Sequence, residues 1–130
     1  MPAFILNMPE VHRERRGHRF YPTPRELTTI PAIYQQDGKG EGAIVYAHYF
    51  SSWGDWYMTE LDPKTGEAFG WACLGGDHLN GEWGYFDIVA LESHVPTYAG
   101  TLVERDLTFT PAPAREVLPS GRRTLRSTED

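Results

Sequence analysis

Two glutamates in aromatic surroundings are the side chains of this sequence best suited to chemistry. Glu60 and Glu82 each lie beside tryptophan or tyrosine in segments with strand-forming composition. Partial burial raises the pKa of a carboxyl group and suits it to acid–base catalysis. Glu60 and Glu82 are therefore candidate catalytic residues, since two such groups on neighbouring strands could support hydrolysis. The structural alternative is that each carboxylate accepts hydrogen bonds from a loop or pairs with Arg25 or Arg105.

Aromatic residues surround both glutamates and could form one platform: Trp53, Trp56, Tyr57, Trp83 and Tyr85. Stacking on such rings contributes roughly 1–3 kcal/mol per contact. With carboxylates beside it, the platform would suit a cationic or hydrogen-bond-donating partner better than a phosphate. The candidate ligand- or partner-binding residues are Trp53, Trp56, Glu60, Trp83 and Tyr85. The alternative is a plain aromatic core.

Metal and cofactor sites are not predicted. A metal site needs three or four convergent ligands, and His48, Glu60, His78 and Glu82 would converge only if their strands align. The one cysteine, Cys73, excludes an internal disulfide and a cysteine-based zinc site, and it is expected to be a buried apolar residue. The segment 70–81 is rich in glycine but lacks the spacing of dinucleotide-binding loops.

Charge is unevenly distributed along the chain. Residues 1–19 carry four Arg and two Glu, residues 20–110 carry four basic and thirteen acidic side chains, and residues 111–130 carry four Arg and three acidic side chains. We therefore predict a flexible basic N-terminal arm over 1–19, a folded domain over 20–110 and a disordered tail over 111–130. The acidic middle would repel nucleic-acid phosphates, so only the Arg-rich ends could contact nucleic acid.

Local patterns predict the elements that position these residues. Thr23-Pro24-Arg25-Glu26 is typical of a helix start with a capping box, and Asp87 is expected to cap a short helix over 87–92. Strand-forming composition predicts strands over 43–50, 56–61, 68–74 and 82–86, with an edge strand over 101–109. Short connections favour an antiparallel meander, so the expected fold class is α+β, with four to five strands, one or two short helices and disordered termini.

A cytoplasmic protein without a membrane segment is expected. No stretch reaches the roughly 18 apolar residues of a membrane span. The apolar run that begins at Phe4 is too short for a signal peptide, and a lone thiol suits a reducing compartment.

The order of short segments along the chain resembles a known family. These segments are Ile30-Pro31-Ala32-Ile33-Tyr34, Val45-Tyr46-Ala47-His48-Tyr49-Phe50, Trp56-Tyr57-Met58-Thr59-Glu60-Leu61-Asp62, Phe69-Gly70-Trp71, Glu82-Trp83-Gly84-Tyr85-Phe86 and Glu104-Arg105-Asp106-Leu107-Thr108-Phe109. Together they resemble the domain of unknown function 2958 family, small bacterial proteins often found on plasmids, phages and other mobile elements. The resemblance implies an α+β unit in a mobile-element setting and implies no reaction.

The sequence thus favours a mobile-element accessory protein that is a non-enzymatic binding module. It would act on a host protein or ligand through its acidic aromatic body, for instance to counter a host defence. The first alternative is a small hydrolase-like enzyme that uses Glu60 and Glu82. The second is nucleic-acid contact through the Arg-rich ends.

Overall fold

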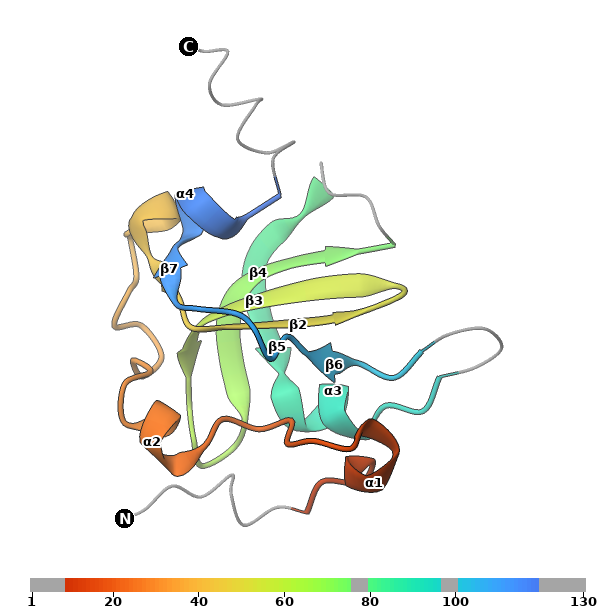
Figure 1. The fold of residues 1–130 in the computed structure, drawn as a ribbon. Helices are drawn as coiled ribbons and strands as arrows, with labels where there is room; N and C mark the ends of the chain where they lie inside the picture. The colour runs from red at the N-terminus through yellow and green to blue at the C-terminus, as the bar shows by residue number, and fades with distance from the viewer. Residues whose placement is uncertain (1–8, 76–79, 97–100, 120–130) are drawn as a thin grey trace.

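An open antiparallel sheet of five strands forms the centre of the computed structural model, in the order β5-β4-β3-β2-β6 (Figure 1). The structure describes residues 9–75, 80–96 and 101–119. The strands are β1 (Ile44–Val45), β2 (Ala47–Ser51), β3 (Gly54–Leu61), β4 (Glu67–Leu74), β5 (Glu82–Asp87), β6 (Glu104–Arg105) and β7 (Ala112–Pro113). β1 and β7 pair separately as a small antiparallel sheet. The predicted α+β class is confirmed.

Helices in the described residues are all short. They are α1 (Arg13–Arg16), α2 (Pro24–Leu27), the 3-10 helix η2 (Gly40–Gly42), α3 (Ile88–Ser93) and α4 (Ala114–Val117). The two predicted caps are confirmed: Thr23 and Glu26 form the capping box of α2, and Asp87 accepts hydrogen bonds from the first turn of α3. None of the helices in this part of the chain has the length and apolar character of a membrane span.

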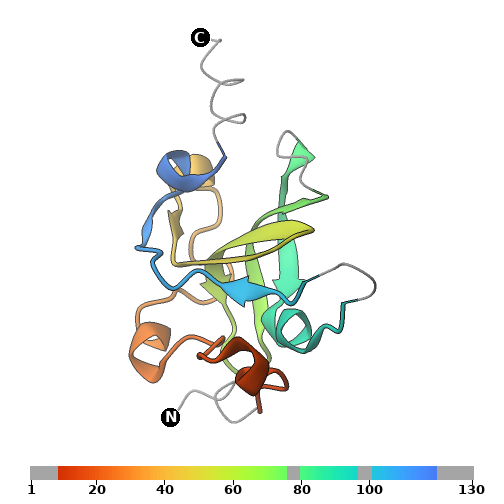
Figure 2. The same ribbon diagram turned by 45° about the vertical axis from the view of Figure 1, so that its right-hand side comes forward.

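The sheet separates two clusters of buried side chains. Its first face carries Tyr49, Trp56 and Met58, and it is covered by α3 and by the segment that contains Phe20 and Tyr21. Its second face carries Tyr57, Trp71 and Cys73, and it is covered by β1 and α4. Figures 1 and 2 show α1 to α3 on one side of the strands and α4 on the other, with β5 leading into α3. Cys73 is buried, as predicted.

A β-bulge in β3 decides where Glu60 points. Met58 pairs with Gly70, but the next pair along the strands is Glu60 with Phe69, so Thr59 is an extra residue. Simple alternation would place Glu60 on the first face beside Met58. The bulge instead places Glu60 against the loop over the second face, while Leu61 returns to the first-face core.

Gly70 is required beside this bulge. A Cβ atom at Gly70 would lie 1.8 Å from the main-chain oxygen of Tyr57, which is far inside van der Waals contact. Because the clash is with backbone, a side chain here would displace β3 itself. The strand pair that positions Glu60 therefore depends on a glycine in β4.

The N-terminal boundary predicted at residue 20 is wrong for residues 9–19, which pack against the sheet domain. Arg16 is buried and donates from its Nη1 atom to Glu92 at 2.8 Å and from its Nε atom to the Val103 carbonyl at 2.8 Å. The main-chain N–H groups of Val11 and His12 also donate to Glu92. The arginines of this segment predicted a solvated arm. The most buried of them, Arg16, instead pairs with Glu92, a carboxylate distant in sequence.

The C-terminal boundary and the last predicted strand also need correction. Residues 111–119 are part of the fold, because Leu118 is only 1% exposed and packs in the second-face cluster. The predicted strand over 101–109 is reduced to the two residues of β6. Asp106 ends it by accepting the N–H of Thr108 at 3.0 Å, which forms a turn. The apolar run that begins at Phe4, the candidate metal ligand His78 and the tail from residue 120 onwards lie outside the described residues.

Candidate partner-binding site

Tyr34 has a strained backbone and an exposed side chain. Its φ angle is 78°, and it is the only residue other than glycine with a positive φ among those the structure describes. Tyr34 is 69% exposed, so burial of its side chain does not offset the energy of the strained backbone. The left-handed conformation costs a non-glycine residue roughly 1–2 kcal/mol. Strain of this kind, held at an exposed aromatic residue, is typical of functional sites.

The buried carboxylate of Glu60 holds Tyr34 in this conformation. Its two oxygens accept the main-chain N–H of Tyr34 at 2.8 Å and that of Gln36 at 2.7 Å. The Gln36 side chain in turn donates to the carbonyls of Ile44 and Thr59 and accepts the N–H of Ile44. The loop is therefore attached both to β3 and to the start of β1.

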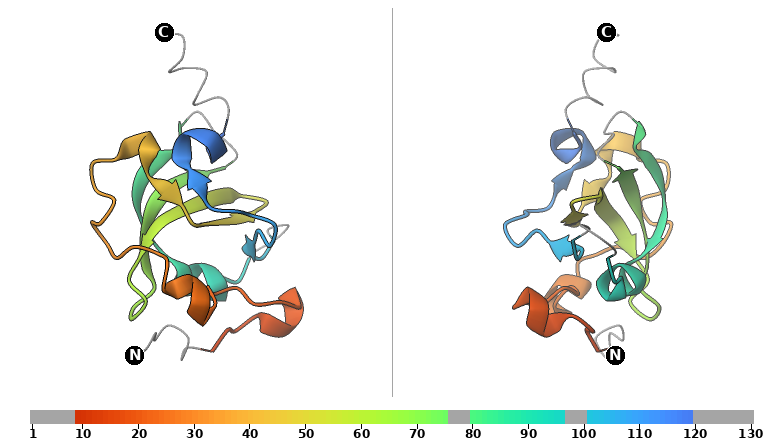
Figure 3. Two further views of the ribbon diagram at one scale, coloured as in Figure 1. Left: turned by 60° about the vertical axis from the view of Figure 1, so that its left-hand side comes forward. Right: turned by 90° about the vertical axis from the view of Figure 1, so that its right-hand side faces the viewer.

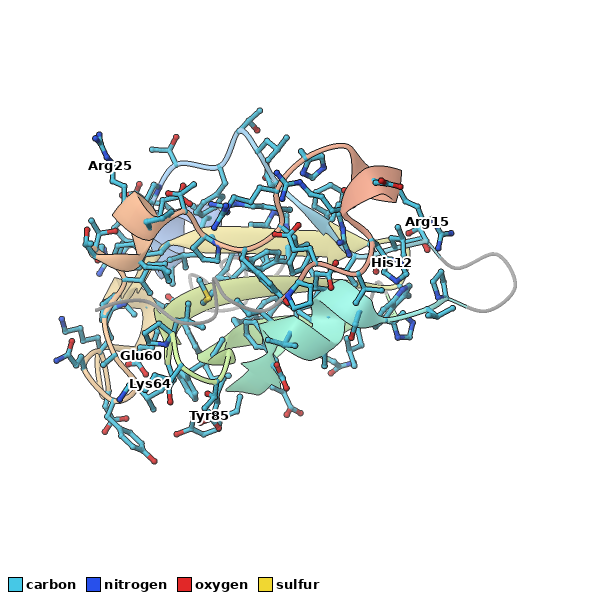
Figure 4. All side chains as sticks on the ribbon, turned by 90° about the horizontal axis from the view of Figure 1, so that it is seen from below. His12, Arg15, Arg25, Glu60, Lys64 and Tyr85 are labelled. Atoms are coloured by element: carbon cyan, nitrogen blue, oxygen red, sulfur yellow. The ribbon has the colours of Figure 1, made fainter. Side chains whose placement is uncertain are left out.

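Tyr85 on β5 completes an exposed tyrosine pair with Tyr34. Interaction with the Tyr34 side chain is the main reason that the pKa of Tyr85 is raised to about 12, with smaller effects of burial and of the charges on Tyr34, Glu67 and Glu60. Tyr85 is 50% exposed, so both tyrosines of the pair reach solvent. In Figure 4 the labels place Tyr85 and Glu60 at the same end of the molecule.

Two further rings extend this pair across the second face. The Phe69 ring lies 6.2 Å from that of Trp83, nearly parallel to it, and 5.0 Å from that of Tyr85, edge to face. Phe69 and Trp83 also border a hollow of about 160 Å³, lined in addition by Gln36, Asp37, Gly38, Gly40, Ala43 and Thr59. We call Tyr34, Phe69, Trp83, Tyr85 and this hollow the aromatic groove. Its volume suits one side chain or small planar group, since pockets for drug-sized ligands begin near roughly 300 Å³.

The structure brings together only part of the predicted aromatic platform. Trp83 and Tyr85 belong to the aromatic groove, and Glu60 lies buried under its Tyr34 loop, whereas Trp56 is buried in the first-face core. Trp53 lies beside Trp56, with its ring 5.0 Å away, so it too is on the first face. The separation follows from strand alternation. Trp56 pairs with Ala72, and Ala72 pairs with Glu82, so these positions lie on the first face. Trp83 and Tyr85 occupy the alternate positions of β5 and lie on the second face. The sequence showed aromatic density but not which rings share a face.

Glu60 and Glu82 do not meet in the structure. Glu60 pairs across the sheet with Phe69, and Glu82 pairs with Ala72 further along β4. Glu60 is buried under the loop of Tyr34, whereas Glu82 is exposed at the start of β5. The two carboxylates therefore point to opposite faces and could not act on one substrate bond. The arrangement offers no support for the hydrolase alternative.

A polar cluster that sequence reasoning missed lies around His48. Its Nδ1 and Nε2 atoms contact Asp106 at 3.1 Å and Asp55 at 2.9 Å, and its ring stacks on Tyr57 with centroids 4.3 Å apart. Both ring nitrogens are occupied, so His48 has no free position from which to abstract a proton. Burial alone would raise the pKa of Asp106, but hydrogen bonds from His48 and Thr108 outweigh it and lower the pKa.

This cluster connects β2, β3 and the turn after β6 and so serves the fold. Histidine and aspartate scattered over three distant segments give no sequence signal of a shared site. In the described residues no group of three or more His, Cys, Asp or Glu side chains could hold a metal ion. His78, one of the metal ligands considered from the sequence, lies outside them.

Comparison with known proteins identifies a family. No curated protein and no solved structure matches the chain. The family model described as Protein of unknown function (DUF2958) matches residues 30–117. That range covers more than half of the chain and includes Glu60 and all four rings of the aromatic groove. The resemblance that the ordered segments indicated is thereby confirmed, and the chain belongs to the DUF2958 family.

Proposed function

We propose that this protein is a non-enzymatic binding module and that the aromatic groove is the surface by which it holds a host protein. The observation that carries the proposal is the strained backbone of Tyr34, whose side chain is exposed and lies near enough to Tyr85 to raise its pKa. A residue that served only a turn at this φ would be glycine or asparagine. A tyrosine at this φ destabilises the fold, and burial of its ring does not offset this loss because the ring is exposed.

The chemistry of the groove supports a protein partner. Tyrosine and tryptophan are enriched among the residues that contribute most to protein interfaces. Glu60 fixes the loop before any partner arrives, which reduces the entropy lost on binding. The hollow has room for one side chain of the partner, and the surrounding rings would stack on it.

Charge favours a basic group on that partner. The chain carries a net charge of −6, and Glu67 and Glu60 lie close enough to Tyr85 to affect its pKa. A cation over the aromatic rings would gain from both the carboxylates and the ring electrons. The resemblance to proteins of mobile elements supports a host protein in the cytoplasm as the target, with counter-defence as the setting.

The nucleic-acid alternative has less support. Of the four arginines in residues 9–19, Arg16 is buried against Glu92, and Arg19 donates to the carbonyls of Tyr21 and Pro22. These two side chains are occupied in the fold. Fewer cations of this segment are therefore available for phosphates than the sequence indicated.

Site-specific photo-crosslinking tests the proposal. A benzoylphenylalanine at position 85 in place of Tyr85 should crosslink one bacterial protein in lysate, and excess wild-type protein should compete. The matched control carries the same group in place of Leu107, which is 62% exposed and distant in the fold. Adding Tyr34→Ala should abolish the adduct formed at position 85, and higher salt should weaken it. Equal adducts from both positions, or none at position 85, would overturn the proposal.

A further inference from the structure

The two edges of the five-stranded sheet are protected very differently. β6, at one edge, has two residues, which is too short to accept another strand. β5, at the other edge, has six residues, and none of the strands in the described part of the chain pairs with its outer side. The right panel of Figure 3 shows β5 along the margin of the sheet. A long free edge presents a row of main-chain donors and acceptors to another chain.

β5 lacks the usual features that block such an edge. Its sequence, Glu82-Trp83-Gly84-Tyr85-Phe86-Asp87, contains no proline and no lysine, and its register with β4 is continuous. Proteins commonly protect exposed edges with proline, lysine or a bulge. Their absence over the whole described strand is what a docking edge requires.

A second hollow lies directly on this edge, next to Gly84. It has a volume of about 370 Å³ and is lined by Ala72, Leu74, Asn80, Glu82, Trp83, Gly84 and Tyr85. A Cβ atom at Gly84 would have nothing within 4 Å, so the space above this residue is open. Leu74 is 60% exposed and Glu82 is exposed, which gives the hollow an apolar wall and an acidic rim. Lysine and arginine match this combination, since their stems are apolar and their ends are cationic.

Charge at the strand ends argues against a second copy of this chain as the occupant. Pairing two β5 strands would bring together the exposed carboxylates of Glu82 and Asp87 from both copies, on chains that each carry a net charge of −6. Like charge gathered along one seam opposes such pairing. The same two carboxylates would attract a basic segment, so charge complementarity selects the occupant.

We propose that the partner supplies an extended basic segment that pairs with the outer edge of β5 as a sixth strand. An arginine or lysine of that segment lies in the hollow over Gly84, beside Glu82. Its alternate side chains lie on the other face, along Trp83 and Tyr85. This inference rests on the proposed function, because the strand that carries the aromatic groove is the strand that pairs.

Synthetic peptides test the pairing on the full-length protein. The parent probe is a fluorescein-labelled peptide of about eight residues with alternating arginine and valine, and binding is measured by fluorescence anisotropy. Two variants carry N-methyl groups on every arginine or on every valine, which removes the main-chain donors from one edge of the peptide or from the other. Strand addition uses one edge, so one variant should lose about tenfold in affinity while the other keeps it. If both variants bind as the parent does, the inference is wrong.

Variants of the protein test the hollow. Glu82→Gln should weaken the parent peptide about three- to fivefold, as expected for a partly exposed ion pair. Gly84→Val should weaken it further by filling the hollow. The control is Glu14→Gln, which removes an exposed carboxylate from α1. If Glu14→Gln has the same effect as Glu82→Gln, the peptide responds to net charge alone, which contradicts the inference.

The outcomes separate this inference from the proposed function. If the two N-methylated peptides differ in affinity but position 85 gives no specific adduct, the aromatic groove is rejected as the binding surface and the strand pairing is kept. A specific adduct without discrimination between the N-methylated peptides would keep the proposed function and reject the pairing. A dimer in sedimentation equilibrium that Gly84→Val dissociates would identify a second copy as the occupant and overturn the choice of a basic segment.

Discussion

Glu60 and Glu92 are both buried carboxylates, yet they stabilise different kinds of structure. Glu92 is fully buried, pairs with the Arg16 guanidinium at 2.8 Å and accepts the N–H groups of Val11 and His12. Glu60 accepts only main-chain N–H groups among its described hydrogen bonds, those of Tyr34 and Gln36. One carboxylate joins a distant segment to the core, and the other holds a short loop in a strained conformation.

Glu92 therefore supports the fold, whereas Glu60 shapes an exposed surface. The guanidinium of Arg16 is covered on the other side by the Phe20 ring, 4.4 Å from its centroid, so the ion pair is sealed. Glu60 instead accepts the main-chain N–H of Tyr34, whose side chain is exposed. Figure 4 shows Glu60 and Tyr85 at one end of the molecule and His12, next to Val11, at the other. The family match begins at residue 30, so it includes Glu60 and the loop of Tyr34 but not Arg16.

Removing Arg16 should have the largest effect on stability. Arg16→Met leaves Glu92 charged and buried without its cation, and we expect the free energy of unfolding to fall by about 3–5 kcal/mol. Urea denaturation followed by tryptophan fluorescence measures this change. The double variant Arg16→Met/Glu92→Leu should recover part of the loss, because no unpaired charge is then buried. Arg15→Met, on the exposed side of α1, is the matched control, and an equal loss there would contradict a special role for the ion pair.

Removing the charge of Glu60 should have a smaller and more local effect. Glu60→Gln keeps one acceptor oxygen, so one of the two main-chain N–H groups loses its partner, at a cost of about 1–2 kcal/mol. Hydrogen exchange should accelerate at Tyr34 and Gln36 with little change in the first-face core. Glu67→Gln, at an exposed position on β4, should leave that exchange unchanged. Uniform acceleration across the sheet would mean that Glu60 supports the whole fold.

Acid should weaken the Glu92 contact in a defined direction. Burial alone would raise the pKa of Glu92, but the N–H groups of His12 and Val11 and the Arg16 guanidinium outweigh it, and the pKa lies below its ordinary value of 4.5. The stabilisation is therefore present above pH 4.5 and is lost as pH falls through the lower pKa of the folded state. The difference in stability between the wild type and Arg16→Met/Glu92→Leu should shrink over this range. A difference that stays constant with pH would contradict the prediction.

Relieving the strain at Tyr34 should have the smallest effect on stability and a large effect on binding. Tyr34→Gly removes a backbone cost of roughly 1–2 kcal/mol. It adds about 0.4–1 kcal/mol of unfolded-state entropy, so a net gain of about 0.5 kcal/mol is expected. Tyr34→Ala keeps the strain and should be less stable than Tyr34→Gly in urea denaturation. Both variants remove the ring and should lose the adduct at position 85, and retention of that adduct in either would contradict a role of Tyr34 in binding.

Local chemistry made several elements of the fold predictable. The capping box of Thr23 and Glu26 and the cap at Asp87 use side chains within a few residues of the main-chain groups that they satisfy. The four central strands follow from runs rich in aromatic and β-branched residues, which pack well on a pleated, half-buried sheet. Trp83, Tyr85 and Glu60 are candidate binding residues on the same local grounds.

The sequence by itself thus determined the strand-rich class, the helix caps and the family. Tertiary structure alone decided that Arg16 meets Glu92, that a bulge at Thr59 turns Glu60 to the second face, and that Tyr34 is held at a positive φ. Each of these depends on groups distant in sequence, such as Arg16 with Glu92 or Tyr34 with Glu60. Periodicity and composition describe a segment by its neighbours along the chain, so they carry no information about contacts that form only when separate segments pack.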